Sequence, residues 1–147
     1  MTAAVVARLT VTAIAAGQGI LPVFIDLNHT HATNPLWTGH ARFHLVQQVF
    51  TVLPAAAIEI ALLWWPGAEM QTHFYLAALL TATSLAGFLI ATVTRTLYGG
   101  ALHDPNGIQP ARLHIGSREF VFDVNVPIVI TATVLLISAV VIFRLVG

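Results

Sequence analysis

Long apolar segments alternate with short polar ones along this chain. Four of the apolar segments reach the roughly 20 residues that an α-helix needs to cross a bilayer. The pattern predicts four membrane-spanning helices, at about residues 3–25, 36–65, 73–97 and 120–146. We therefore expect an all-α fold, an integral membrane four-helix bundle in which residues 1–147 form a single domain.

The order of these segments determines where the polar connections lie. Four spans put both termini on the same side of the membrane, together with the short turn at residues 66–71. The connections at residues 26–37 and 99–119 then share the opposite side. We expect these two histidine-bearing connections to meet at one end of the bundle.

The composition indicates that lipid is the main solvent of the chain. Hydrophobic residues make up 57% of it and charged residues 8%, whereas soluble domains carry about 25% charged residues. The net charge is zero and lysine is absent, so the chain lacks the basic surface of a nucleic-acid-binding protein. Cysteine is also absent, which excludes disulfides, thiolate metal ligands and a cysteine nucleophile.

We expect a multi-pass protein of the cytoplasmic membrane. The first apolar segment lacks a clear small-residue cleavage site, so it is interpreted as a retained helix rather than a signal peptide. Positive residues near the membrane ends favour the cytoplasmic side. The arginines near the two long connections outnumber those near the termini, which favours a cytoplasmic position for the long connections (Arg42, Arg95, Arg112 and Arg118 against Arg8 and Arg144).

The polar stretch from Asp26 to Gln48 contains four of the seven histidines. His40 and His44 are four residues apart, so on a helix they lie on one face. Two nitrogens presented in this way could bind a metal ion, or one could bind haem iron axially. His29 and His31, just upstream, could add ligands. The alternative is that these histidines line a wet membrane interface and hydrogen-bond neighbouring helices.

Carboxylates are scarce near these histidines. Metal sites in helical bundles usually contain a Glu-x-x-His pair, and this chain has none. Glu59 lies fifteen residues beyond His44, which is roughly 22 Å along a helix at 1.5 Å per residue. We expect Glu59 to pair with Arg8 or Arg144 instead of sharing a metal ion with His44.

A second polar block follows the third apolar segment. Arg95 and Tyr98 precede Gly99 and Gly100, and a glycine pair of this kind ends a helix. Tyr98 is either an interfacial anchor or a phenol that faces a bound cofactor. Further along, three residues could bind haem propionates or lipid head groups, although simple solvation of the loop is the plainer interpretation (Arg112, His114 and Arg118).

Three stretches resemble the small membrane styrene oxide isomerases, a family of four-helix proteins that bind haem b and rearrange epoxides to aldehydes. The first is Asp26-Leu27-Asn28-His29, and the second is Trp37 followed by Ala41-Arg42-Phe43-His44. The third is Tyr98 with six residues before Pro105-Asn106. The family has an asparagine shortly after the histidine, whereas this chain has Phe50, with Gln47 and Gln48 nearby.

The resemblance implies that His44 is the axial haem ligand and that Tyr98 faces the substrate. In that family the ferric iron acts as a Lewis acid on the epoxide oxygen. His40, Arg42 and Arg95 would then lie near the cofactor, with an arginine paired to its propionates. The resemblance also implies a homotrimer and a lipophilic substrate that enters from the bilayer.

Two other functions agree with the sequence. One is a non-haem metal enzyme or metal-handling membrane protein that uses a divalent ion at His29, His31, His40 and His44. The other is a non-catalytic membrane module whose histidines are structural or respond to pH.

Overall fold

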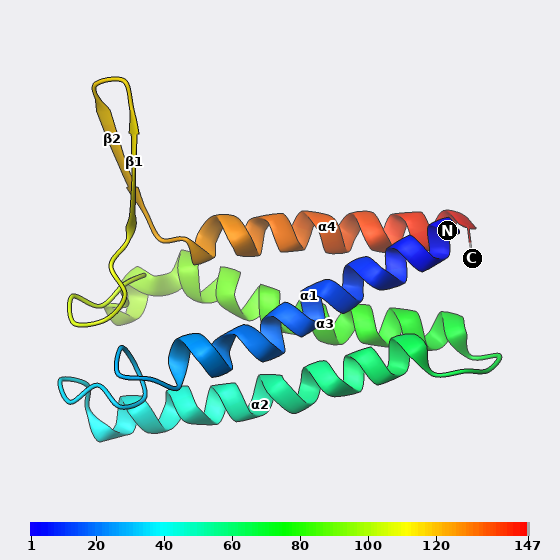
Figure 1. Ribbon diagram of the computed structural model, residues 1–147, viewed down its shortest axis with the longest axis horizontal. Helices are drawn as coiled ribbons and strands as arrows, with labels where there is room; N and C mark the ends of the chain where they lie inside the picture. Colours follow the sequence, from blue (N-terminus) through cyan, green and yellow to red (C-terminus); the bar gives the residue numbers. More distant parts are fainter. Residues whose placement is uncertain (147) are drawn as a thin grey trace.

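The computed structural model describes residues 1–146 and contains four long helices and one β-hairpin (Figure 1). All four helices are long and apolar enough to cross a membrane, which confirms the prediction of four long apolar helices. The helices are α1 (Ala3–Asp26), α2 (Gly39–Trp64), α3 (Met70–Thr94) and α4 (Asn125–Val146). A 3₁₀ turn, η1 (Arg95–Tyr98), extends α3.

The helices run roughly side by side along the long axis of the molecule. The start of α1 and the end of α4 lie at the same end of the bundle (Figure 1). The connection from α1 to α2 and the connection from α3 to the hairpin lie at the other end (Figure 1). We call this second end, where the polar stretch Asp26–Gln48 lies, the histidine end. Its two connections come together as the order of the segments predicts.

Three helix starts differ from the prediction, and the third helix begins at Met70 rather than at residue 73. The second helix begins at Gly39 rather than at residue 36, because the Thr38 hydroxyl accepts a hydrogen bond from the backbone N–H of Ala41 and caps the helix there. The fourth helix begins at Asn125 rather than at residue 120. The predicted start was wrong because the residues before Asp123 form a strand.

The hairpin consists of β1 (Ala111–Ile115) and β2 (Arg118–Phe122), which pair in an antiparallel register. Apolar and polar residues alternate along β1, as the period of a β-strand requires, whereas β2 has Arg118 and Glu119 followed by three apolar residues. Between the strands, Gly116 has φ +61°, a left-handed conformation that favours glycine in tight hairpin turns. This alternation and the Gly-Ser turn are local signals that the helix-based interpretation of the sequence overlooked.

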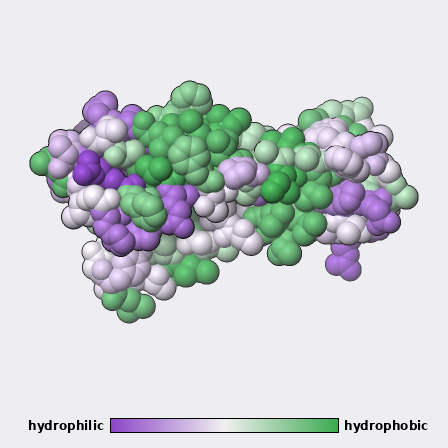
Figure 2. All heavy atoms as spheres, turned by 90° about the horizontal axis from the view of Figure 1, so that it is seen from below, coloured by the Kyte–Doolittle hydropathy of each residue, from purple (hydrophilic) through white to green (hydrophobic). Residues whose placement is uncertain are grey.

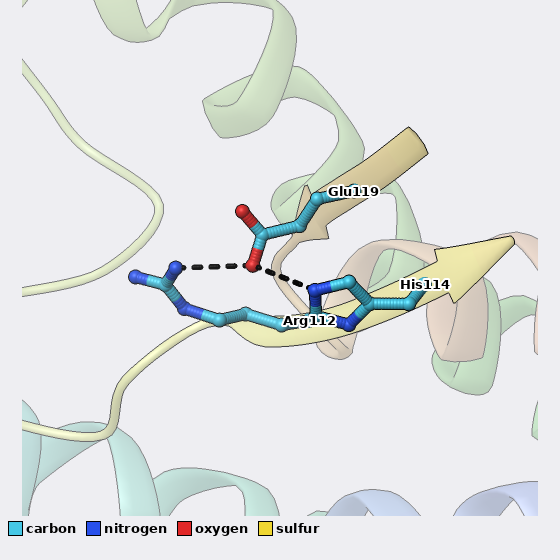
Figure 3. Close-up of polar contacts among 3 residues, drawn as sticks. All are labelled: Arg112, His114 and Glu119. Atoms are coloured by element: carbon cyan, nitrogen blue, oxygen red, sulfur yellow. Dashed lines mark hydrogen bonds and ion pairs between the residues drawn. The ribbon is translucent and has the colours of Figure 1, made fainter. Parts of the chain in front are cut away.

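The hairpin is amphipathic and projects away from the bundle, across the direction of the helices (Figure 1). The strand register puts five apolar residues on one of its faces: Ala111, Leu113, Ile115, Phe120 and Phe122. On the other face, Oε1 of Glu119 lies 3.1 Å from a guanidinium nitrogen of Arg112 and 3.6 Å from Nε2 of His114 (Figure 3). Exposed ion pairs of this kind contribute little to stability. The two contacts with Glu119 involve Arg112 and His114, which are two of the three loop residues that could bind haem propionates.

The most tightly packed part of the bundle is the half that contains the termini. The rings of Phe74 (α3) and Phe143 (α4) stack with centroids 3.7 Å apart, and each residue is 1% exposed. Small residues of α1 and α3, among them Ala7 and Ala77, allow the helices to approach closely around this pair.

Arginine and tryptophan side chains fasten α1 to the end of α2 in the same half. The Nε of Arg8 donates a hydrogen bond of 2.8 Å to the carbonyl oxygen of Leu63, and its guanidinium lies 4.3 Å from the ring centroid of Trp64. The indole N–H of Trp64 donates to the Thr12 hydroxyl at 2.9 Å. Arg8 therefore stabilises the last turn of α2. The expected Arg8–Glu59 pair was wrong, because the carboxyl group of Glu59 contacts Thr81 of α3.

The histidine half of the bundle is packed far less tightly. No residue is buried in residues 20–26 of α1, 39–48 of α2, 86–98 of α3 and η1, or 125–135 of α4. Many of these residues are apolar, including Phe43, which is 63% exposed. Figure 2 shows hydrophobic side chains over much of the length of the molecule and hydrophilic ones gathered toward its ends.

Candidate functional site

The two connections at the histidine end are fastened together by one buried asparagine. Asn34 is 3% exposed. Its amide nitrogen donates to the carbonyl oxygens of Thr30, at 3.2 Å, and Asn106, at 2.7 Å, and its Oδ1 accepts from the backbone N–H of Leu36 at 3.0 Å. The 27–38 connection is therefore attached to the connection that follows α3. This contact confirms that the two polar regions meet.

We expect Asn34→Ala to loosen this attachment without unfolding the helices. The change leaves buried backbone groups without partners, at a loss of about 1–3 kcal/mol of local stability. Hydrogen exchange should accelerate for the amides of residues 27–38 and 99–110, while α1 and α4 keep their protection. Asn28→Ala is the matched control, because the Asn28 side chain bonds within its own connection and to the end of α1. Equal acceleration throughout the bundle would contradict this local role.

His40 and His44 form a close pair at the start of α2. Their Nε2 atoms lie 3.0 Å apart, and the two rings meet edge to face with centroids 4.4 Å apart. Both residues are exposed. The structure thus brings together the two histidines whose spacing predicted a shared face, and it leaves their ring nitrogens accessible from outside the bundle.

The other two histidines of the stretch belong to the connection before α2. His29 is exposed, whereas Nδ1 of His31 lies 2.8 Å from the Thr30 hydroxyl and the His31 ring packs edge-on against Trp37. Within residues 1–146, no three histidine or carboxylate side chains come close enough to hold one metal ion. The four-histidine metal site considered from the sequence is therefore not assembled here.

Tyr98 and Arg95 turn back onto their own helix. The Tyr98 hydroxyl donates to the carbonyl oxygen of Ala91 at 2.8 Å, although the residue is 63% exposed. Arg95 donates to the carbonyl oxygen of Thr92 at 2.6 Å. Both side chains donate to backbone carbonyl oxygens in the last turn of α3. No hydrogen bond or aromatic contact joins Tyr98 to His44 in the part of the chain that the structure describes.

Two side chains near the start of α2 have donor groups that lack an ion-pair or hydrogen-bond partner among residues 1–146. Arg42 is half-buried and takes no part in the ion pairs formed among residues 1–146. The indole Nε1 of Trp37 is buried and has no hydrogen-bond partner. Buried donors of this kind are usually satisfied. The Arg42 guanidinium could bind a carboxylate, whereas the indole N–H of Trp37 would first have to become exposed.

The site fits haem b in its donor set. The imidazole of an exposed histidine suits an axial iron ligand, and Arg42 could pair with a propionate. The exposed apolar side chains of the histidine half, such as Phe43 and Phe50, would contact the faces and edge of a macrocycle. Sequence reasoning named His40, His44 and Arg42. It did not identify the hydrogen bonds of Asn34 that join the two connections, or the indole N–H of Trp37 that lacks a partner. Both depend on how segments far apart in the sequence pack together.

Comparisons with protein-family models, with curated proteins and with solved structures gave no match to this chain.

Proposed function

We propose that this chain is a multi-pass membrane protein that binds haem b through His44 and acts on a lipophilic small molecule at the histidine end. One observation carries the proposal: the exposed, closely spaced His40–His44 pair lies at the end of the bundle where residues 39–48 of α2 include no buried residue. Ionisable groups within or beside membrane spans generally mark a function.

The reaction class that the resemblance favours is isomerisation of an epoxide to an aldehyde. When bound, ferric haem would supply a Lewis acid for the epoxide oxygen. His44 would hold the group in place, Arg42 or Arg95 would pair with its propionates, and the bilayer would deliver the substrate to the exposed apolar side chains. Isomerisation needs no co-reactant, since substrate and product contain the same atoms.

Tyr98 would orient the substrate after leaving its present partner. Its hydroxyl donates to the carbonyl oxygen of Ala91, and giving up one such bond costs about 0.5–1.5 kcal/mol. The side chain is exposed and can rotate without disturbing a packed core.

The experiment is turnover of a lipophilic epoxide by haem-supplied protein in phosphatidylcholine vesicles. We expect aldehyde formation by the wild type, none above background by His44→Ala, and a reduction of at least about tenfold in kcat for Tyr98→Phe, since one oriented hydrogen bond near a reacting centre is typically worth that much. His103→Ala, a change to an exposed loop histidine, should leave the rate unchanged. Haem-loaded protein that converts no epoxide faster than vesicles containing haem alone would contradict the isomerase assignment.

A divalent metal ion is the second candidate, and the distance between the histidine nitrogens favours it. A zinc–nitrogen bond is about 2.0–2.1 Å long, so two Nε2 atoms 3.0 Å apart can share one ion. Water would complete the coordination. Stoichiometric zinc, copper or iron without a haem absorption band, lost in both His40→Ala and His44→Ala, would favour this candidate over haem.

A further inference from the structure

One acidic residue lies inside the bundle, away from the histidine pair. Glu59 of α2 is 4% exposed, and its carboxyl Oε2 lies 2.7 Å from the hydroxyl of Thr81 on α3. Thr81 itself is 0% exposed. Ionisable groups within membrane spans are expensive and generally mark a function. A glutamine could bridge the two helices equally well, so helix packing alone does not explain an acid here.

Residues 1–146 supply no cation for this carboxyl group. The elements packed against it present Gln18 from α1 and Thr81 from α3, neither of which titrates. Arg8, the arginine of α1, bonds to the Leu63 carbonyl and stacks on Trp64. Within residues 1–146 the ion pairs lie in the hairpin alone. An ionised Glu59 would thus be a buried charge without a counter-ion, which is strongly unfavourable.

The hydrogen bonds at Thr81 also indicate a neutral acid. The Thr81 hydroxyl lies 2.7 Å from Oε2 of Glu59 and 3.0 Å from the carbonyl oxygen of Ala77. A hydroxyl has one proton, and a helical threonine commonly donates it to the carbonyl four residues earlier. Two full hydrogen bonds therefore require a second proton. A protonated carboxyl group of Glu59 would supply that proton.

Glu59 lies at the floor of a groove between α2 and α3. The groove encloses about 230 Å³, and Gln18, Thr51, Ala56, Glu59, Thr83 and Ser84 are among its lining residues. Thr51, Thr83 and Ser84 are exposed, whereas Ala56 and Glu59 are buried. The groove therefore runs inward from the lipid-facing surface. In Figure 2, which shows the α2 side, less hydrophobic side chains interrupt the apolar surface midway along the bundle.

Two hydrogen-bond acceptors at this floor lack partners. Among the described residues, Oε1 of Glu59 and Oε1 of Gln18 accept no hydrogen bond, since the Gln18 amide is engaged through its nitrogen, at the Thr81 carbonyl. A complementary ligand must present N–H donors and, ideally, the positive charge that the protein omits. A lipophilic primary amine has both properties.

We propose that the α2–α3 groove binds the amino group of a lipophilic amine, with Glu59 as its proton donor and counter-ion. The neutral amine enters from the bilayer. The O–H bond of Glu59 breaks, its proton joins the nitrogen lone pair, and an ammonium–carboxylate pair forms. The Thr81 hydroxyl then turns to donate to the carboxylate. This site is independent of the His40–His44 pair.

Infrared spectroscopy of the protein in phosphatidylcholine vesicles tests both parts of the proposal, with octylamine as the probe. At neutral pH we expect a C=O band of a protonated carboxylic acid that shifts on ¹³C labelling of glutamate and is missing in Glu59→Gln. Glu69→Gln, a change to an exposed residue at the start of α3, should keep the band. Octylamine should convert it to a carboxylate band, whereas octan-1-ol, which has the same chain but cannot take the proton, should not.

The Ser84→Leu variant tests the role of the groove separately from the role of the Glu59 carboxyl group. The larger side chain occupies the exposed rim of the groove and leaves Glu59 and Thr81 unchanged. We expect this variant to retain the acid band and to need on the order of tenfold more octylamine for half conversion, equivalent to about 1.4 kcal/mol. No acid band in the unliganded wild type, conversion by octan-1-ol, or an unchanged midpoint in Ser84→Leu would each overturn the proposal.

Discussion

Replacing Gly19 with leucine is expected to prevent α1 and α2 from packing as they do. A Cβ atom at Gly19 would lie 2.5 Å from the Cβ of Ala56 and 3.4 Å from the carbonyl oxygen of Val52. Neither neighbour can move away without shifting α2, because both contacts involve short side chains or backbone. We expect a loss of stability of at least the roughly 1–3 kcal/mol of ordinary overpacking.

Gly87→Leu is the matched control, since a Cβ atom at Gly87 meets nothing within 4 Å. Leucine also favours the helix over glycine, so this change should be neutral or stabilising by up to about 1 kcal/mol. The measurement is unfolding of both variants in detergent micelles by denaturant, followed by circular dichroism. Equal stability of the two variants would show that the α1–α2 approach is not as close as described.

Phe143→Ala is expected to be the most damaging change in the core. Phe143 is 1% exposed and stacks on Phe74 with ring planes 11° apart. Truncating a buried phenylalanine typically costs about 3–5 kcal/mol, because the lost contacts are added to the cavity left behind. Tyr75 also meets the Phe143 ring edge to face, so the neighbouring rings cannot easily collapse into the space.

Phe24→Ala provides the comparison, because Phe24 is on α1 at the histidine end and is 73% exposed. It should change the midpoint of unfolding little. A double substitution at Phe74 and Phe143 should be less destabilising than the sum of the two single changes, since each removes the same stacking contact. Additive losses would argue against the stacked pair.

The helices were predictable because apolar runs of sufficient length fold as helices in lipid, where every backbone polar group needs an internal partner. The same reasoning failed at residues 111–122. There the chain is exposed, and the alternation of Arg112, Leu113 and His114 with a Gly-Ser turn decides the structure. A signal of only five residues in each strand is weak beside a long apolar span.

The candidate site was predictable only where it is local in sequence. The i, i+4 spacing of His40 and His44 was sufficient to place them together. Contacts between distant segments were not accessible in this way: Asn34 with Asn106, and Glu59 with Thr81, depend on how the helices pack. The expectation that Glu59 would pair with an arginine was wrong, because Arg8 donates to the backbone carbonyl oxygen of Leu63 in the last turn of α2.

The central claim is that His44 holds haem at an exposed face of α2. The most direct measurement is the absorption spectrum of detergent-purified protein, expressed with haem supply, for the wild type and for His44→Ala. His103→Ala serves as the control, because it removes an exposed histidine of the loop after η1. We expect a Soret band in the wild type and in His103→Ala, and its loss in a His44→Ala variant that retains full helicity. A well-folded wild type without a Soret band, or a His44→Ala variant that keeps it, would contradict the claim.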